Sequence, residues 1–173
     1  MTAAPPPPKL LPSAADILRC VREVTHDLIA PGLAGHAERS AAATIDHMLR
    51  YVERLVEHQG QDLLDEEAKL KALLPGAADW LAGRDAALAG AIRADCAGTP
   101  DPAVYPTLAM MEDRVALLRQ HVCDALLALH AAGEAKGADG TALHATLRDY
   151  IRWQIAREGA LVEPAFLGHG PRR

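Results

Sequence analysis

The sequence is poor in aromatic residues, and it has no long apolar run. Aromatic residues make up 3% of the 173 residues, although half of the chain is hydrophobic. A core with so few rings has to be built from alanine and aliphatic side chains, which favours helices packed closely on helices. No stretch reaches the roughly 18 apolar residues of a candidate membrane-spanning helix. We therefore expect a protein that does not cross a membrane.

Basic residues and paired cysteines are also scarce. The net charge is −5, which argues against a nucleic-acid partner because such surfaces carry a basic excess. Cys20, Cys96 and Cys123 lie far apart and form no CxxC pair, so we expect no disulfide framework and a reducing, cytoplasmic location. Since the N-terminus has no basic segment followed by an apolar one, we expect no signal peptide.

Sequence motifs for catalysis are missing as well. The chain has no Walker loop and no GxGxxG motif, which argues against a nucleotide-binding enzyme. No nucleophile arrangement stands out. Cys20 and Cys123 lie on or beside apolar stripes, so we interpret both as small core residues. We expect no cofactor.

What the sequence does contain is a series of amphipathic helical patterns. They predict an all-α, single-domain bundle of about six helices over residues 13–159. The expected helices cover residues 14–29, 40–59, 62–74, 84–96, 107–132 and 141–158. Ser13 is expected to cap the first helix, with Asp16 in the capping-box position, and Thr141 is expected to cap the last. The helix over 107–132 has apolar residues at a 3-4 spacing, which are Leu108, Met111, Val115, Leu118, Val122, Ala125 and Leu129. Four consecutive prolines predict a disordered arm over residues 1–12. Residues 160–173 form a tail, and the proline-rich loop 97–106 is a candidate sub-boundary.

The clearest helical pattern lies in residues 40–59. Its apolar residues follow a 4-3-4-3 spacing and form a stripe that should face other helices. The stripe consists of Ala41, Ile45, Met48, Val52 and Leu55. The first helix has a similar expected inner stripe, which consists of Ile17, Val21, Val24 and Leu28. Gly60 and the Pro75-Gly76 pair are expected to end the second and third helices.

Three charged residues are candidates for contact with a partner. Arg50 and Arg54 lie four residues apart on the polar side of the second helix, beside Glu53 and Glu57. This side is either a salt-bridged, solvated face or a contact for phosphate or acyl-CoA. Glu67 is the third candidate, because its spacing from Leu63, Leu70 and Leu74 places it inside an apolar stripe.

A metal site is an alternative that the histidines suggest. Di-iron bundles need Glu-x-x-His pairs from two helices, and this chain has one, Glu23 to His26, with His26 expected to face solvent. The end of the last expected helix, DYIRWQIAREGALVEPAF, resembles the last helix of hemerythrin-like bundles. The pair matching their His-x-x-x-Glu is Gln154 and Glu158, and His58 and Asp62 have the same spacing. We favour structural polar contacts between helices as the interpretation of these four residues, and we predict no bound transition metal.

A wider resemblance covers residues 14–102. The matching pieces are ILRCVRE, IAPGLAGHAERSAAA, LRYVERLVE, EEAKLKALLPG and LAGAIRAD. In order and spacing they resemble a family of small helical proteins of unassigned function, found beside aminoglycoside-phosphotransferase-like kinases and acyl-CoA dehydrogenases. The later segment LHATLRDYIRWQIARE is similar to the closing helix of that family.

This resemblance implies a non-catalytic accessory subunit. In the family's setting of hydroxyacyl-CoA breakdown, the kinase phosphorylates the substrate, the dehydrogenase-like enzyme removes the phosphate, and the helical protein assists the kinase. The expected partner is therefore the kinase or the dehydrogenase, with a homo-oligomer as a further option. An accessory subunit should expose an apolar patch of several hundred Å². A hemerythrin-like or other ligand-binding bundle should instead have a polar cavity lined by Gln154 and Glu158.

Overall fold

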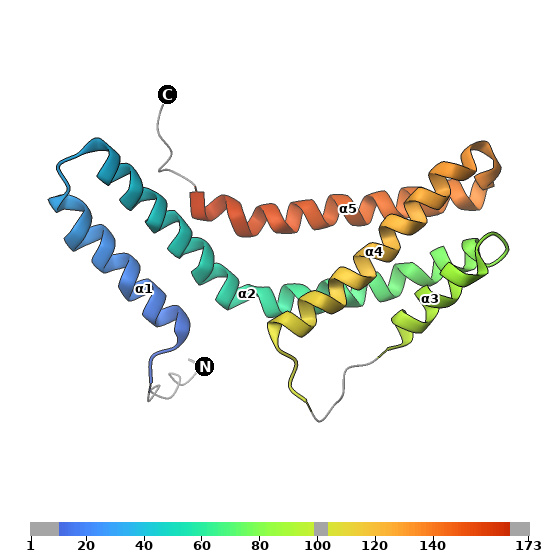
Figure 1. Cartoon of the computed structure of the whole chain (residues 1–173), viewed down its shortest axis with the longest axis horizontal. Coiled ribbons are helices and arrows are strands. Elements are labelled where there is room, and N and C mark those ends of the chain that lie inside the picture. The colour runs from blue at the N-terminus through green and yellow to red at the C-terminus, as the bar shows by residue number, and fades with distance from the viewer. Residues whose placement is uncertain (1–10, 99–103, 167–173) are drawn as a thin grey trace, which may run out of the picture. The chain divides into compact units, whose positions relative to one another are not determined.

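The computed structural model describes residues 11–98 and 104–166, which form helices and turns but no strand (Figure 1). This confirms the all-α class, with five α-helices in place of about six. They are α1 (Ala14–Val24), α2 (His36–Leu81), α3 (Ala86–Ala97), α4 (Leu108–Ala132) and α5 (Gly137–Phe166). Short turns of other helical types are η1 (Thr25–Ile29), η2 (Ala30–Gly32) and η3 (Gly133–Lys136).

Two predicted elements fall partly outside this range. The N-terminal arm predicted for residues 1–12 lies almost wholly outside the described residues, as does the end of the predicted tail. The part of the tail that is described belongs to α5, which continues to Phe166. Among the described residues, we find no helix with the length and hydropathy needed to cross a membrane.

Helix α2 is much longer than the sequence predicted, because neither Gly60 nor Pro75 ends it. An interior glycine costs only about 1 kcal/mol relative to alanine, and an interior proline costs about 3 kcal/mol. Packing around Pro75 offsets that cost, since the neighbouring apolar side chains are completely buried. These are Leu70, Leu74, Ala77, Ala78 and Leu81. Pro75 itself is exposed.

The last helix begins before Thr141, the residue predicted to cap it. Gly133 and Gly137 both have positive φ, at 54° and 67°, so the turn between α4 and α5 is tight and α5 starts at Gly137. The Thr141 hydroxyl donates to the Gly137 carbonyl and therefore lies within the helix. The expected end near Gly159 is also wrong, because the helix passes through that residue.

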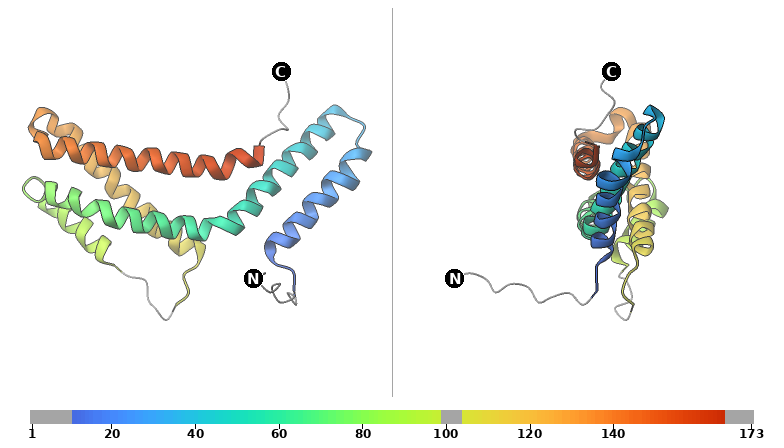
Figure 2. Two further views of the ribbon diagram at one scale, coloured as in Figure 1. Left: turned by 180° about the vertical axis from the view of Figure 1, so that it is seen from behind. Right: turned by 90° about the vertical axis from the view of Figure 1, so that its left-hand side faces the viewer.

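The chain divides into two compact units. Unit 2 comprises residues 59–158, and unit 1 comprises residues 1–58 together with 159–173. Unit 2 contains the hydrophobic core, to which its parts of α2, α3, α4 and α5 all contribute (Figure 2). The spacing predicted along α4 is confirmed from Val115 onward, with Val115, Leu118, Val122, Ala125 and Leu129 buried, whereas Leu108 at its start is 44% exposed. Helices α3 and α4, on either side of the 97–106 loop, belong to the same unit.

Unit 1 is a helical hairpin joined by the end of α5. Helix α1 begins with the predicted capping box, in which Ser13 and Asp16 satisfy each other's backbone donors. The turns η1 and η2 then lead into α2, which returns antiparallel to α1. The Arg54 guanidinium donates to the carbonyls of Ala160 and Leu161, and these bonds attach the last turns of α5 to α2.

Candidate functional site

Ion pairs, rather than apolar side chains, line the inside of the hairpin. Arg19 lies 2.9 Å from Glu53 and 3.5 Å from Glu57. Arg22 lies 3.5 Å from Glu53 and 4.0 Å from Asp46. As the residue number rises along α1, the partner's number falls along α2, so these pairs fix the register of the two antiparallel helices. Val21 is consequently level with the turn of α2 that carries Val52.

Three of the charges at this contact are largely withdrawn from water, whereas Arg19 and Glu57 are 44% and 41% exposed. The Asp46 side chain is 8% exposed, and the side chains of Glu53 and Arg22 are 13% and 24% exposed. Desolvation offsets much of the attraction in buried ion pairs, so they contribute more to alignment than to stability. The hairpin therefore gains a defined geometry from its ion pairs but little free energy of folding.

The apolar stripes of both helices face outward, which contradicts the prediction that they point into a bundle. Ile17, Val21 and Val24 of α1 are between 41% and 53% exposed, and Leu28 in the following π-helical turn is 74% exposed. On α2, Leu55 of the predicted stripe is half-buried, but four other large apolar side chains are between 40% and 60% exposed. These are Ile45, Met48, Val52 and Val56. Cys20 is exposed too, and so is Cys123 in unit 2, so neither is the predicted core residue.

The two stripes lie on the same side of the hairpin. Successive residues of an α-helix are about 100° apart. With Arg22 and Asp46 facing each other, Val21 and Ile45 are each one such step back along their own helix. Because the helices are antiparallel, one residue back along α1 and one residue back along α2 turn toward the same side of the hairpin. We call this side the hairpin face and define it as Ile17, Val21, Val24, Ile45, Met48, Val52 and Val56.

Unit 1 buries almost no apolar side chain of its own. Among its residues with described side chains, the buried ones are Ala15, Ala42, Asp46 and His47. Helices in water draw most of their stability from packing an amphipathic face, at roughly 25 cal/mol per Å² of buried apolar surface. Covering the apolar side chains of the hairpin face would therefore stabilise unit 1.

Arg50 and Arg54, the two arginines predicted for partner contact, are occupied within unit 1. Arg50 lies 2.9 Å from Asp46, and its side chain is 25% exposed. The Arg54 guanidinium donates hydrogen bonds to the two carbonyls of α5. Since both side chains support the fold of unit 1, replacing them would weaken the hairpin itself and would not isolate an interface.

Glu67, the third predicted contact residue, lies in unit 2 within a polar cluster. It lies 2.7 Å from Lys71 and 3.3 Å from Arg114. Burial acts to raise the pKa of Glu67, but hydrogen bonds from Lys71 and Arg114 outweigh burial and lower the pKa. The cluster borders a hollow of about 230 Å³ whose other walls are mostly apolar. They include Leu64, Pro106, Met110 and Met111.

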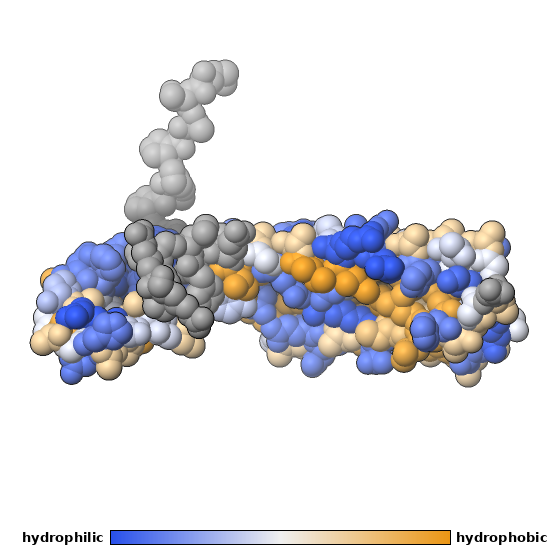
Figure 3. Space-filling model, turned by 90° about the horizontal axis from the view of Figure 1, so that it is seen from above, coloured by the Kyte–Doolittle hydropathy of each residue, from blue (hydrophilic) through white to orange (hydrophobic). Residues whose placement is uncertain are grey.

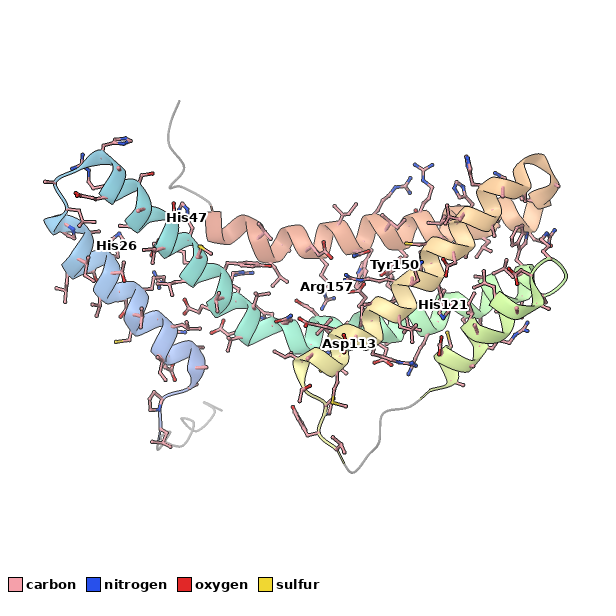
Figure 4. The ribbon with its side chains drawn as sticks, in the orientation of Figure 1. His26, His47, Asp113, His121, Tyr150 and Arg157 are labelled. Atoms are coloured by element: carbon pink, nitrogen blue, oxygen red, sulfur yellow. The ribbon has the colours of Figure 1, made fainter. Side chains whose placement is uncertain are left out.

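The four residues of the metal alternative take part in other contacts. Asp62 accepts from Arg157, which also donates to Asp65 and points from α5 toward α2 (Figure 4). Gln154 donates to Glu158 at 3.0 Å, and Glu158 is exposed. His58 is exposed and lies 3.9 Å from Glu57. Among the described residues, no group of three His, Cys, Asp or Glu side chains could hold a metal ion.

A buried polar network in unit 2 was not predicted from the sequence. Glu66 accepts two hydrogen bonds of 2.7 Å from Arg119 and one of 2.6 Å from the Tyr150 hydroxyl. Its spacing from Leu63 and Leu70, 3 and 4 residues, is the signal that could have placed it inside. A second pair joins buried His121 to Asp95 at 2.7 Å. These contacts tie the helices of unit 2 together.

Exposed apolar residues also occur on unit 2, and some of them gather. Leu64 and Met110, which are 49% and 48% exposed, both line the hollow beside Glu67. Leu117 and Leu127 on α4 and Ile155 on α5 are between 41% and 67% exposed. Figure 3 shows a band of hydrophobic residues along one side of this unit, bordered by hydrophilic ones. Single exposed apolar residues are common on monomeric proteins, whereas a contiguous apolar stripe indicates an interaction surface.

Comparisons with family models, with curated proteins and with solved structures found no match.

Proposed function

We propose that this chain is a non-catalytic assembly subunit, joined to the other polypeptides of its complex through the hairpin face. One observation carries the proposal. Two helices present seven large apolar side chains on one side, each at least 40% exposed, while Arg22, Asp46 and Glu53 pair between the helices. A standard interface buries on the order of 800 Å² per partner, and side chains of this size and exposure offer several hundred.

The enzyme served by this assembly is, in our proposal, a phosphotransferase-like kinase acting in hydroxyacyl-CoA catabolism. The support is the resemblance of residues 14–102, whose first three pieces lie in the hairpin. A subunit without chemistry of its own can raise kinase activity by favouring a binding-competent conformation, which removes the penalty of a sparsely populated state. An acyl-CoA dehydrogenase in the same complex is the second candidate partner.

The test is to co-express the chain with an aminoglycoside-phosphotransferase-like kinase. We expect a complex by size exclusion and a higher kinase activity on hydroxyacyl-CoA substrates than the kinase shows alone. Val21→Glu should diminish both, because it places a charge in the centre of the hairpin face. Ser40→Asp is the matched control, since it adds the same charge to the other side of α2. Equal activity and solubility with and without the chain, and no complex, would refute the proposal.

A further inference from the structure

The hollow beside Glu67 is a concave surface that lies wholly within unit 2. Its walls come from α2, from α4 and from the segment just before α4. Leu64, Pro106, Met110 and Met111 supply most of its surface, which is apolar. Leu64 and Met110 are 49% and 48% exposed, so water reaches these side chains. A small apolar molecule that covered them would displace this water, which is a main source of affinity at concave sites.

Arg114 makes one end of the hollow polar, and part of its guanidinium is not engaged. The Nε atom faces Glu67, and Nη2 donates to the carbonyls of Asp95 and Gly98. In the described part of the chain, no hydrogen bond uses Nη1, and Nη1 is not among the buried atoms without a partner, so it remains accessible. Nη1 lies beside Gly98, which also lines the hollow, since a Cβ added to Gly98 would be 3.3 Å from it. The guanidinium therefore keeps two N–H donors that a bound molecule can use.

The charges at this end of the hollow favour an anion. Lys71 and Arg114 are both cations, and they share one acid, Glu67, whose side chain is 12% exposed. The nearby carboxylate of Asp95 is paired with His121, 2.7 Å away. Two cations therefore face one acid, and a carboxylate at Nη1 would balance the second cation. Hydrogen bonds between a guanidinium and a carboxylate are roughly twice as strong as those between neutral groups.

We infer that this hollow binds a small carboxylate with an apolar body, the carboxylate on Arg114 and the body between Leu64, Met110 and Met111. An apolar cavity of about 150 Å³ takes a benzene ring of six carbons, so a hollow of about 230 Å³ takes a body of about eight or nine carbons. Methionine side chains adapt to the shape of such a body because they are unbranched. Octanoate, with eight carbons, is the probe that meets these requirements. The inference goes beyond the proposed function and does not rest on it, because no contact with a kinase enters the argument.

Carbon-13 labelling of the methionine methyl groups tests the inference on the full chain. Of the four methionines, Met110 and Met111 line the hollow, whereas Met48 lies on the hairpin face and is 60% exposed. Titration with octanoate should shift the Met110 and Met111 signals saturably and leave the Met48 signal unchanged. Met48 thus reports adsorption to exposed apolar surface in general, and Met48→Ala and Met110→Ala assign the signals. Butyrate, which is four methylenes shorter, should bind at least about tenfold more weakly than octanoate.

Two comparisons locate the apolar body and the carboxylate separately. Leu64→Ala should raise the dissociation constant of octanoate about fivefold or more, because it removes part of the apolar wall. Leu127→Ala is the matched control, since Leu127 is 67% exposed and lies outside the hollow. Octanoate should bind the wild type about tenfold more tightly than 1-octanol does, and Arg114→Gln should abolish this preference. Because the preference is a ratio measured within one variant, it does not depend on the stability of that variant.

Each contrary result overturns the inference in a recognisable way. No saturable shift at Met110 and Met111 excludes the site, and an equal shift at Met48 means that octanoate adsorbs to any exposed apolar surface. Wild-type binding of 1-octanol as tight as that of octanoate refutes the placing of the carboxylate on Arg114. An unchanged dissociation constant in Leu64→Ala refutes the placing of the apolar body. None of these results touches the proposed function, whereas a chain that binds octanoate but no kinase refutes the proposed function alone.

Discussion

At the scale of single residues, Glu66 and Glu67 show how strongly the burial of two adjacent carboxylates can differ. Both are followed by apolar residues at helical spacing, and the sequence pointed to Glu67. The structure buries Glu66 at 6% exposure and leaves Glu67 at the border of a hollow. Successive residues of a helix are about 100° apart. Because the apolar stripe is several residues wide, spacing alone does not decide which of the two glutamates points inward.

We predict that Glu66→Ala lowers the free energy of unfolding by roughly 2–4 kcal/mol. The substitution leaves the Arg119 guanidinium and the Tyr150 hydroxyl without their shared acceptor, and breaking a buried pair is strongly destabilising. Arg119 is 37% exposed, so water compensates part of the loss. Glu158→Ala is the control, since that carboxylate also meets Arg119 but is 58% exposed, and it should cost under about 1 kcal/mol. Urea unfolding of both variants is the measurement, and equal losses would contradict the prediction.

Tyr150 gives a prediction about pH. Burial, together with the hydrogen bond to Glu66, raises the pKa of the Tyr150 hydroxyl above its ordinary value of 10.0. The folded state thus favours the neutral phenol. The resulting stabilisation is complete below pH 10.0 and is lost as the pH rises toward the raised pKa. Between about pH 9 and about pH 11, the wild type should lose unfolding free energy more steeply than Tyr150→Phe.

A matched control exists for this pH dependence. Tyr105 is 93% exposed, so the unfolding free energy of Tyr105→Phe should fall with rising pH as steeply as that of the wild type. If Tyr150→Phe and the wild type show the same slope in urea unfolding, burial of the Tyr150 hydroxyl does not influence stability in this range.

At the scale of secondary structure, the sequence predicted what depends on local spacing and missed what depends on packing. The apolar spacing of α4 and the Ser13 capping box are local signals, and both predictions are confirmed. Gly60 and Pro75 are local signals too, but their penalties of about 1 and 3 kcal/mol are small beside the burial of the side chains around them. Helix boundaries at such residues therefore depend on tertiary contacts that the sequence does not display.

The continuity of α2 leads to a test with two glycines. A Cβ at Gly60 would lie 3.8 Å from the Leu108 side chain, which is an ordinary contact, whereas at Gly140 it would lie 2.7 Å from Trp80. Since both residues are inside helices, Gly60→Ala should stabilise the protein by up to about 1 kcal/mol. Gly140→Ala should destabilise it by about 1–3 kcal/mol through overpacking. Thermal unfolding decides, and a destabilising Gly60→Ala would favour the helix break that the sequence suggested.

At the scale of the whole molecule, the hairpin is where sequence reasoning and structure differ most. The stripes of residues 14–29 and 40–59 were recognised, but they were assigned to the interior of a single bundle. Periodicity identifies which residues share a side of a helix, and it does not say whether the same chain or another one covers that side. The charged residues of unit 1 carried the missing information, since Arg19, Arg22, Asp46 and Glu53 pair across the hairpin and turn the stripes outward.

Unequal burial in the two units predicts unequal protection from hydrogen exchange. Unit 2 holds the large buried side chains, whereas the described part of unit 1 buries two alanines, Asp46 and His47. Segments with few buried apolar contacts open at low free energy. Amides of residues 14–24 should therefore exchange much faster than those of residues 115–129. Hydrogen exchange followed by mass spectrometry is the measurement. Equal protection of α1 and α4 would mean that the ion pairs alone stabilise the hairpin.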